Sequence, residues 1–257
     1  RELAVNLVEI LKSSVNSAVI TDISIAGAGF INFTFAPSFY GMRLQDLLLE
    51  GENIGRNERG RGIKANVEYV SANPTGLLHV GHGRGAAYGM TVANLLEAIG
   101  YQVEREYYVN DAGRQMAILA TSTFLRYLQL NGAAFKFPSN GYKGDYIFDI
   151  AKAVIATEGN KWQQDAVAVF ADVPADEVKN EAGEVIYGDK EAHIDGLIAN
   201  AKANLGDNYQ IFHEAALNTI LADIQDDLAD FNVHFDQWFS EKSIQDAIVP
   251  ALELLQQ

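Results

Sequence analysis

Hydrophobic positions in the first fifty residues follow the periods of a helix, a strand and a second helix. Apolar residues recur at helical spacing in "ELAVNLVEILKSS" (2–14) and alternate with polar residues in "AGAGFINFTFA" (26–36). The segment "PSFYGMRLQDLLLEG" (37–51) starts with proline and ends with glycine, which is typical of a helix with its end signals. We predict a small α+β unit here, or the tail of one.

The next segment has no hydrophobic period. It reads "GENIGRNERGRGIK" (51–64) and is rich in glycine and charge, which is typical of a linker. We therefore place a domain boundary near Gly60 and predict two domains, residues 1–60 and residues 61–257.

From Ala65 onward the pattern indicates a parallel α/β sheet. A strand is predicted in "ANVEYVSA" (65–72), a helix over 79–100 and a strand in "QVEREYYV" (102–109), which together make one βαβ unit. Further helices are predicted in "GRQMAILATSTFLRYLQL", "DYIFDIAKAVIATEG", "KWQQDAVAVFADV" and "YQIFHEAALNTILADIQDDLADF", and a short strand in "NVHFDQWF". The predicted fold is α/β, a Rossmann-like parallel-sheet nucleotide-binding core with a helical insertion, preceded by a partial α+β N-terminal domain.

Composition narrows the possible functions. The chain has 257 residues, of which 48% are hydrophobic, so it can bury a large core. It has no cysteine, which excludes disulfides and thiolate metal sites. The net charge of −15 opposes nonspecific binding to nucleic acid. No apolar run reaches the ~20 residues of a membrane-spanning helix, and we expect a cytoplasmic protein.

The stretch "SANPTGLLHVGHGRGAAYGM" (71–90) carries the strongest chemical signal. His79 and His82 lie on one face of the first helical turn, among the glycines at 81, 83 and 85. A helix N-terminus attracts phosphate, and both rings can donate hydrogen bonds to phosphate oxygens. We predict that the pair stabilises charge on a triphosphate attacked at its α-phosphorus. The alternative is that one histidine only caps the helix.

Two other interpretations of this stretch are weaker. Gly81, Gly83 and Ala86 fit the G-x-G-x-x-G/A dinucleotide fingerprint, and Glu104 is near the expected ribose-binding acid, but ten residues separate Val70 from Gly81. A metal site could use the two histidines with Asp111, yet helical zinc pairs usually stand four residues apart. We therefore predict no metal site.

Other polar residues follow the predicted strands. Asn110, Asp111 and Gln115 come after the strand 102–109, whose carboxyl end should open toward the ligand crevice of the sheet. An ordinary helix-capping role for Asp111 is an equal alternative. Glu241 follows "FDQWFS" at an expected strand end, where it is either a ligand-binding carboxylate or the capping acid of the next helix.

The sequence from "VEYVSANPTGLLHVGHGRG" to "YYVNDAGRQM" resembles the bacterial arginyl-tRNA synthetases, and "HVGH" resembles the HIGH signature of class I synthetases. "AGAGFINF", "YKGDYI" and "FDQWFSE" are similar to further segments of that family, in the same order. The resemblance therefore spans nearly the whole chain.

The resemblance implies an arginine–tRNA ligase of translation, with L-arginine, ATP and tRNA(Arg) as partners and Mg²⁺ accompanying ATP. By match to the signature, His79, Gly81 and His82 would bind ATP, with the two histidines stabilising the transition state. Ser71 and Asn73 would hold the backbone groups of arginine, and Glu241 its guanidinium group. A monomer is expected.

The chain also departs from the family pattern, because it has no K-M-S-K-like loop and no helical anticodon-binding domain. We expect an incomplete piece of the enzyme that is inactive alone. The alternatives are an NAD-type oxidoreductase and a nucleotide- or tRNA-binding module without catalysis.

Overall fold

The computed structural model describes residues 1–256, which form two compact units. Unit 1 comprises residues 1–59 with 98–100, and unit 2 comprises the remainder. The two units divide between Arg59 and Gly60. This is within the segment 51–64, whose lack of a hydrophobic period suggested a boundary near Gly60. That unit 1 is part of a tRNA-binding domain and unit 2 part of a catalytic domain stays a prediction.

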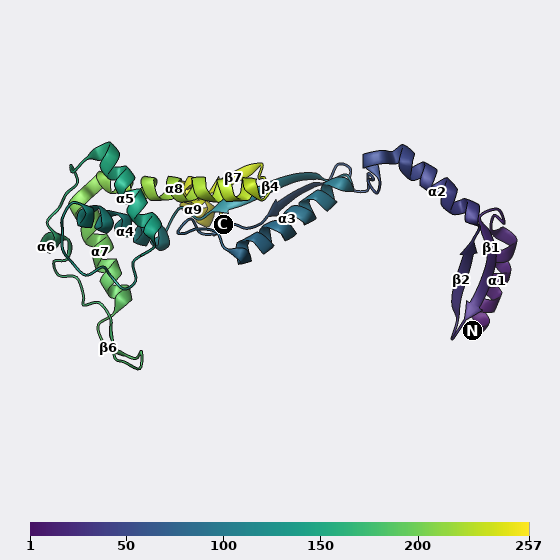
Figure 1. The fold of residues 1–257 in the computed structure, drawn as a ribbon, viewed down its shortest axis with the longest axis horizontal. Coiled ribbons are helices and arrows are strands. Elements are labelled where there is room, and N and C mark those ends of the chain that lie inside the picture. The colour runs from purple at the N-terminus through teal and green to yellow at the C-terminus, as the bar shows by residue number, and fades with distance from the viewer. Residues whose placement is uncertain (257) are drawn as a thin grey trace. The chain divides into compact units, whose positions relative to one another are not determined.

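Unit 1 is a helix, a β-hairpin and a second helix (Figure 1). Its elements are α1 (Glu2–Ser14), β1 (Ile20–Ala26), β2 (Phe30–Phe35), α2 (Pro37–Glu50) and the 3-10 turn η1 (Gly51–Asn53). Both helices are confirmed, but the prediction of a single strand was wrong. The missed strand β1 pairs antiparallel with β2 and has a register shift between Ile20 and Asp22. That irregularity breaks the strict alternation by which a strand is recognised in sequence.

The centre of unit 2 is a three-stranded parallel sheet in the order β3-β4-β7. Its strands are β3 (Lys64–Glu68), β4 (Gln102–Val109) and β7 (Gln237–Ser240). Helix α3 (Val80–Ala98) connects β3 to β4 and runs alongside them (Figure 1). The parallel sheet with flanking helices confirms the predicted α/β fold.

The chain between β4 and β7 is mainly helical, as predicted. It contains α4 (Arg114–Leu130), α5 (Asp145–Glu158), α6 (Ala166–Val169), β5 (Val178–Lys179), β6 (Val185–Tyr187), α7 (Lys190–Leu205), η2 (Gly206–Asn208) and α8 (Tyr209–Asp230). After β7 come the 3-10 turn η3 (Glu241–Ile244) and α9 (Gln245–Leu255). Helix α4 packs against α5, α7 and α8, and its side chains from Thr121 to Leu125 are all buried.

Two parts of this helical region differ from the sequence prediction. The helix predicted over 161–173 is wrong except for α6, which ends before Asp172 takes a left-handed φ of 56°. Helix α7 was missed, although its buried residues Ile194, Leu197, Ile198 and Ala201 have helical spacing. Its start signal was also present, since the Asp189 carboxylate accepts hydrogen bonds from two backbone N–H groups of the first turn.

Two hydrophobic clusters hold unit 2 together. One lies among α4, α5, α7 and α8 and includes Phe124 and Phe212, both fully buried. The other joins the sheet to the helices and contains Tyr69, Tyr107 and Met116. The second cluster anchors the carboxyl ends of two strands, because Tyr69 directly follows β3 and Tyr107 lies near the end of β4. No helix among the described residues is long and apolar enough to span a membrane.

Candidate active site

The carboxyl ends of the three parallel strands lie at the same edge of the sheet. Glu68 ends β3, Val109 ends β4 and Ser240 ends β7. The site residues predicted from the sequence follow these strand ends. In open parallel sheets this edge forms the ligand crevice, so the topology places the candidates on the side where ligands bind.

The loop after β3 is held against β4 in an unusual conformation. Val70 and Ser71 have φ values of 64° and 39°, which side chains other than glycine rarely adopt. The Ser71 Oγ accepts a 3.0 Å hydrogen bond from the Tyr108 backbone N–H, and the Tyr107 hydroxyl donates to the Ala72 carbonyl at 3.0 Å. Strained backbone of this kind costs of order 1–3 kcal/mol and gathers at functional sites. Ser71 therefore anchors the loop through its side chain, and a role in binding arginine stays a prediction.

Asp111 joins the ends of β4 and β7. Its side chain is buried, with 7% of its surface exposed. One carboxylate oxygen accepts a 2.6 Å bond from the Ser240 hydroxyl, and the other accepts a 2.9 Å bond from the backbone N–H of Lys242. The expected alternative, a cap on the following helix, is wrong, because α4 begins after Gly113 with no side-chain cap. Asp111 instead caps η3 from the neighbouring strand.

Glu241 follows β7 directly and faces the Asn110 side chain. A carboxylate cannot donate, so the Asn110 amide is oriented with its nitrogen toward Glu241. In that orientation the Asn110 nitrogen lies 2.6 Å from Glu241 Oε2 and 3.1 Å from the Ala112 carbonyl. The other end of the Asn110 amide is then its oxygen, 3.1 Å from the Asn73 side-chain amide, which donates to it when its own nitrogen is turned toward Asn110. Asn110 thus links the loop after β3 to the end of β7. The sequence had named it among the residues that follow the strand 102–109 toward the ligand crevice, and a ligand role for it stays a prediction.

Three carboxylates gather around Tyr108. Burial raises the pKa of the Tyr108 hydroxyl, and the charges of Glu241, Asp111 and Glu68 raise it further, in that order. Glu68 is the last residue of β3 and is exposed. Sequence reasoning missed Glu68, although a charged residue ending an otherwise alternating strand was a usable signal. Since the Asp111 carboxylate bonds to Ser240 and Lys242, Glu68 and Glu241 are the carboxylates best placed to receive a cationic ligand.

His79 and His82 form a reciprocal cap at the start of α3. The His79 Nδ1 accepts a 3.1 Å bond from the Gly81 N–H, and the His82 Nδ1 accepts a 3.3 Å bond from the His79 N–H. This is the capping-box arrangement, with imidazoles in place of the usual hydroxyl and carboxylate. The two rings stack with centroids 3.7 Å apart and planes at 16°. The capping alternative is therefore correct for both histidines, and it leaves the other ring nitrogen of each available.

The cap assigns a protonation state to both rings. Each Nδ1 accepts a hydrogen bond, so the proton of a neutral imidazole resides on Nε2. Burial lowers the pKa of His82, and the adjacent His79 lowers it further, which favours the neutral form. Gly81 makes this stacking possible, because a Cβ there would lie 2.9 Å from the His79 Cε1. The histidines can thus act as two Nε2–H donors at a helix N-terminus.

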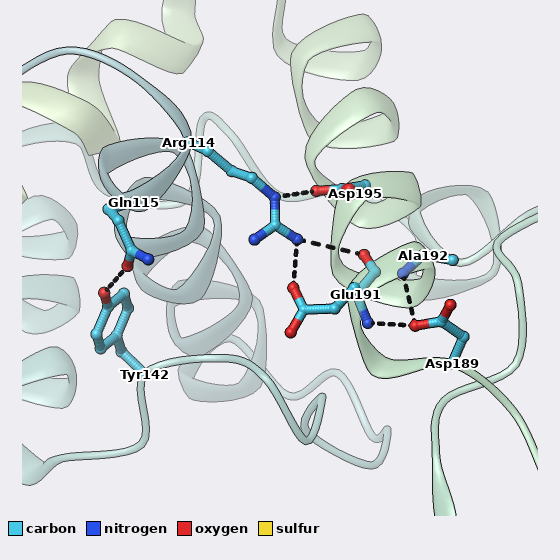
Figure 2. A network of polar contacts seen from close by, with 7 residues as sticks. All are labelled: Arg114, Gln115, Tyr142, Asp189, Glu191, Ala192 and Asp195. Carbon is cyan, nitrogen blue, oxygen red and sulfur yellow. Dashed lines mark hydrogen bonds and ion pairs between the residues drawn. The ribbon is translucent and has the colours of Figure 1, made fainter.

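Gln115 lies in a different set of contacts, among the helices. The Tyr142 hydroxyl donates a 2.5 Å hydrogen bond to Gln115 Oε1. Beside it, the Arg114 guanidinium forms ion pairs of 2.7 Å with Glu191 and 2.8 Å with Asp195 (Figure 2). These bonds tie the start of α4 to α7. Among the bonds of the described residues, none links Gln115 to the other predicted site residues, and its ligand role stays a prediction.

The structure brings Asn73, Asp111 and Glu241 together through Asn110 and Tyr108, whereas His79 and His82 form their own cluster at the start of α3. Within the described residues, no group of three or more His, Asp or Glu side chains is arranged to hold a metal ion.

Comparison with known proteins assigns part of the chain to a family. Residues 43–139 match the model for the catalytic domain of class I tRNA synthetases of the arginine type, "tRNA synthetases class I (R)". This segment belongs to the class I arginyl-tRNA synthetases. The arginine–tRNA ligase of Acinetobacter baumannii (strain AYE) is 53% identical over 255 residues, which cover 97% of this chain and 43% of that protein. The ligase of Psychrobacter sp. (strain PRwf-1) is 54% identical over 237 residues, or 91% of this chain and 39% of that protein.

Solved structures agree on the fold. A candidate arginyl tRNA synthetase from Campylobacter jejuni superposes with a TM-score of 0.63 at 27% identity, covering 86% of this chain and 40% of that one. Arginyl-tRNA synthetase from Plasmodium falciparum gives a TM-score of 0.53 at 13% identity over 98% of this chain and 38% of that one, which concerns the fold alone. The chain thus spans less than half the length of the relatives it matches. The relatives named here are all of the arginyl-tRNA synthetase type, and none is an NAD-type oxidoreductase.

Proposed function

We propose that this chain forms the arginine- and ATP-binding part of an arginine–tRNA ligase. In the first step, a carboxylate oxygen of arginine attacks the α-phosphorus of ATP, the bond to the β-phosphate breaks, and pyrophosphate leaves. In the second step, a hydroxyl of the terminal adenosine of tRNA(Arg) attacks the arginyl carbonyl and AMP leaves. The observation that best supports this proposal is the pair of carboxylates, Glu68 and Glu241, whose charges act on Tyr108 at the sheet edge.

These two carboxylates suit the arginine side chain. A guanidinium group is planar, permanently charged and rich in donors, so carboxylates in fixed positions accept paired hydrogen bonds from it. Glu241 is held by the Asn110 amide at 2.6 Å, and Glu68 belongs to a strand. A lysine ammonium presents a point charge and cannot use two fixed carboxylates in the same bidentate manner. The site therefore favours arginine.

His79 and His82 suit the phosphates of ATP. Their two Nε2–H groups and the N-terminus of α3 offer donors and partial positive charge where negative charge builds up during attack at phosphorus. Because the rings are neutral donors held by the backbone, they stabilise charge without transferring a proton. We expect Mg²⁺ to come bound to the triphosphate, as part of the substrate.

Ser71 and Asn73 lie in the sequence between Glu68 and His79. We propose that Asn73 contacts the backbone groups of arginine and that Ser71 mainly holds the loop. A cytoplasmic location follows from tRNA as the second substrate. A monomeric state, and the inability of the 257 residues to charge tRNA alone, stay predictions.

Exchange of pyrophosphate into ATP tests the proposal. The assay uses a protein of the relatives' full length that contains this sequence, with arginine or lysine, and with and without tRNA(Arg). Arginine should support exchange and lysine should not. A protein that binds ATP or tRNA but supports no exchange under any of these conditions would be a binding module, and the proposal would fail.

A further inference from the structure

A cavity of about 220 Å³ in unit 2 lies behind the carboxylate cluster, among the start of α4, the helices α7 and α8, and the turn η3. It is lined by polar side chains that the proposed reaction does not use. They are Lys202, Gln210, His213, Lys242 and Gln245. Glu68, Glu241 and the two histidines of the α3 cap are not among its lining residues, and Asp111 is the residue that it shares with the carboxylate cluster.

The cavity gathers positive charge in a chain whose net charge is −15. Lys202 and Lys242 both line it, and neither forms an ion pair with a carboxylate among the described residues. The Lys202 ammonium lies 5.5 Å from the centre of the Tyr209 ring. Lysines in an acidic protein usually meet carboxylates, so two unpaired ones facing the same cavity indicate an anionic ligand.

Uncharged donors add to the two lysines. The His213 Nδ1 is buried and has no hydrogen-bond partner within the described structure, although buried ring nitrogens are normally satisfied. The side-chain amides of Gln210 and Gln245 reach the same space. The first backbone N–H groups of α4 begin at Gly113, which also lines the cavity and has no side-chain cap.

Asp111 is the one carboxylate among the described lining residues, and its oxygens are already in use. They accept hydrogen bonds from the Ser240 hydroxyl at 2.6 Å and the Lys242 backbone N–H at 2.9 Å. The Asp111 charge is thus partly compensated by these two donors, while the Lys202 and Lys242 ammonium groups have no carboxylate paired with them among the described residues.

We infer that this cavity binds a phosphate group. Lys202 and Lys242 supply the charge, while His213 and the two glutamine amides supply directed hydrogen bonds from several sides, as a tetrahedral anion requires. The phosphate comes either from a free anion such as pyrophosphate or from the backbone of an RNA. The inference does not rest on the proposed ligase activity, because phosphate binding can be measured directly.

Titration of the 257-residue chain with inorganic pyrophosphate tests the inference. Calorimetry measures the binding, and NMR spectra show whether the ring resonances of His213 shift. Lys202→Gln and Lys242→Gln should each weaken binding by about tenfold or more, since each removes a charged hydrogen bond. Lys242→Arg should retain it. Lys136→Gln, which removes an exposed lysine outside the cavity, should bind like the unchanged chain. Absence of binding at millimolar pyrophosphate, equal loss in the Lys136 control, or an unmoved His213 resonance would overturn the inference.

Competition separates the two sources of phosphate. If RNA occupies the cavity, a tRNA transcript should displace pyrophosphate, and Lys242→Gln should reduce the salt dependence of tRNA binding by about one phosphate contact. If a free anion occupies it, pyrophosphate should bind equally well in the presence of the transcript. Both outcomes support a phosphate site and differ only in what fills it.

Discussion

The Asp111 carboxylate, at the end of β4, accepts a 2.6 Å hydrogen bond from the hydroxyl of Ser240, at the end of β7. The next residue after Ser240 is Glu241, and the residue before Asp111 is Asn110, whose amide faces Glu241 at 2.6 Å. One buried contact between two strand ends thus sets the position of the carboxylate that we assign to the arginine side chain. A change in this contact should affect both stability and arginine binding.

Asp111→Ala should therefore lower the free energy of unfolding by about 1–3 kcal/mol, because it leaves the half-buried Ser240 hydroxyl and the Lys242 N–H without an acceptor. In the full-length enzyme it should also raise the KM for arginine more than the KM for ATP. Urea unfolding and exchange kinetics measure the two effects. Asp149→Ala serves as the control, since Asp149 forms only an exposed ion pair with Lys152. Equal stability of the two variants would contradict the role of Asp111.

The caps at the start of α3 allow catalysis to be separated from stability. Asn is a good residue at the N-cap and Gln is a good residue at the third position of a helix. His79→Asn and His82→Gln should therefore keep the start of α3 while removing the Nε2–H donors. Adenylate formation should slow by ~10² to 10³, as for the loss of one charge-stabilising donor. ATP binding and the melting temperature should change little. Single-turnover kinetics measure the rate, and an unchanged rate in both variants would exclude the proposed role.

Glu68→Gln and Glu241→Gln should each raise the KM for arginine by about 10- to 100-fold, because a hydrogen bond between charged groups contributes about 1.5–3 kcal/mol. The KM for ATP should stay near its original value, since the phosphates bind elsewhere. Glu104→Gln is the matched control, because Glu104 is an exposed acid nearer the amino end of β4. A Glu241 variant that melts at a lower temperature but has normal arginine kinetics would establish a capping role instead.

Much of this fold follows from the sequence pattern, because its long elements have a clear period. The βαβ unit and α8 are recognisable from spacing alone, and the HVGH stretch indicates the start of α3. The missed strand β1 has a bulge that disturbs its alternation. For short segments such as α6, tertiary contacts decide the conformation, and local propensity does not.

The candidate site was less predictable than the fold. His79, His82 and Glu241 were recognisable from the residues and the family motif, but the contacts that each of them makes are not encoded in spacing. Asn110 links Asn73 to Glu241 only because two loops distant in sequence meet at one sheet edge. Asp111 was expected to cap its own helix with the same weight as to face a ligand. It does not cap that helix, because its carboxylate bonds across to Ser240 and Lys242, and its ligand role stays a prediction.

The stability of unit 2 should decrease on acidification through the titration range of histidine. Burial lowers the pKa of both His82 and His213, with the charges of His79 and Lys242 as the next causes. The folded protein then binds fewer protons than the unfolded chain at and below the ordinary histidine value of about 6.5. The contribution of these two groups is therefore present above that pH and is lost as the pH falls.

Urea unfolding at pH 7.5 and pH 5.5 measures this dependence. The double variant His82→Gln, His213→Gln should show a smaller difference between the two pH values than the unchanged chain. His234→Gln is the control, since His234 is exposed. An equal pH dependence in the double variant would show that carboxylates, and not these histidines, are responsible.

Two glycines of α3 should respond in opposite directions to alanine. A Cβ at Gly89 would lie 2.2 Å from the Cγ of Tyr69, whose ring is packed against Phe235 and whose hydroxyl donates to the His234 carbonyl. Because that ring is held on several sides, Gly89→Ala should destabilise unit 2 by about 1–3 kcal/mol, as overpacking does. A Cβ at Gly85 would meet no atom within 4 Å. Gly85→Ala should stabilise the protein by about 0.5–1 kcal/mol, because alanine loses less conformational entropy in a helix. Thermal unfolding of the two variants measures whether each substitution raises or lowers the stability. If Gly85→Ala lost as much stability as Gly89→Ala, the close approach of α3 to Tyr69 would not be the reason for glycine at position 89.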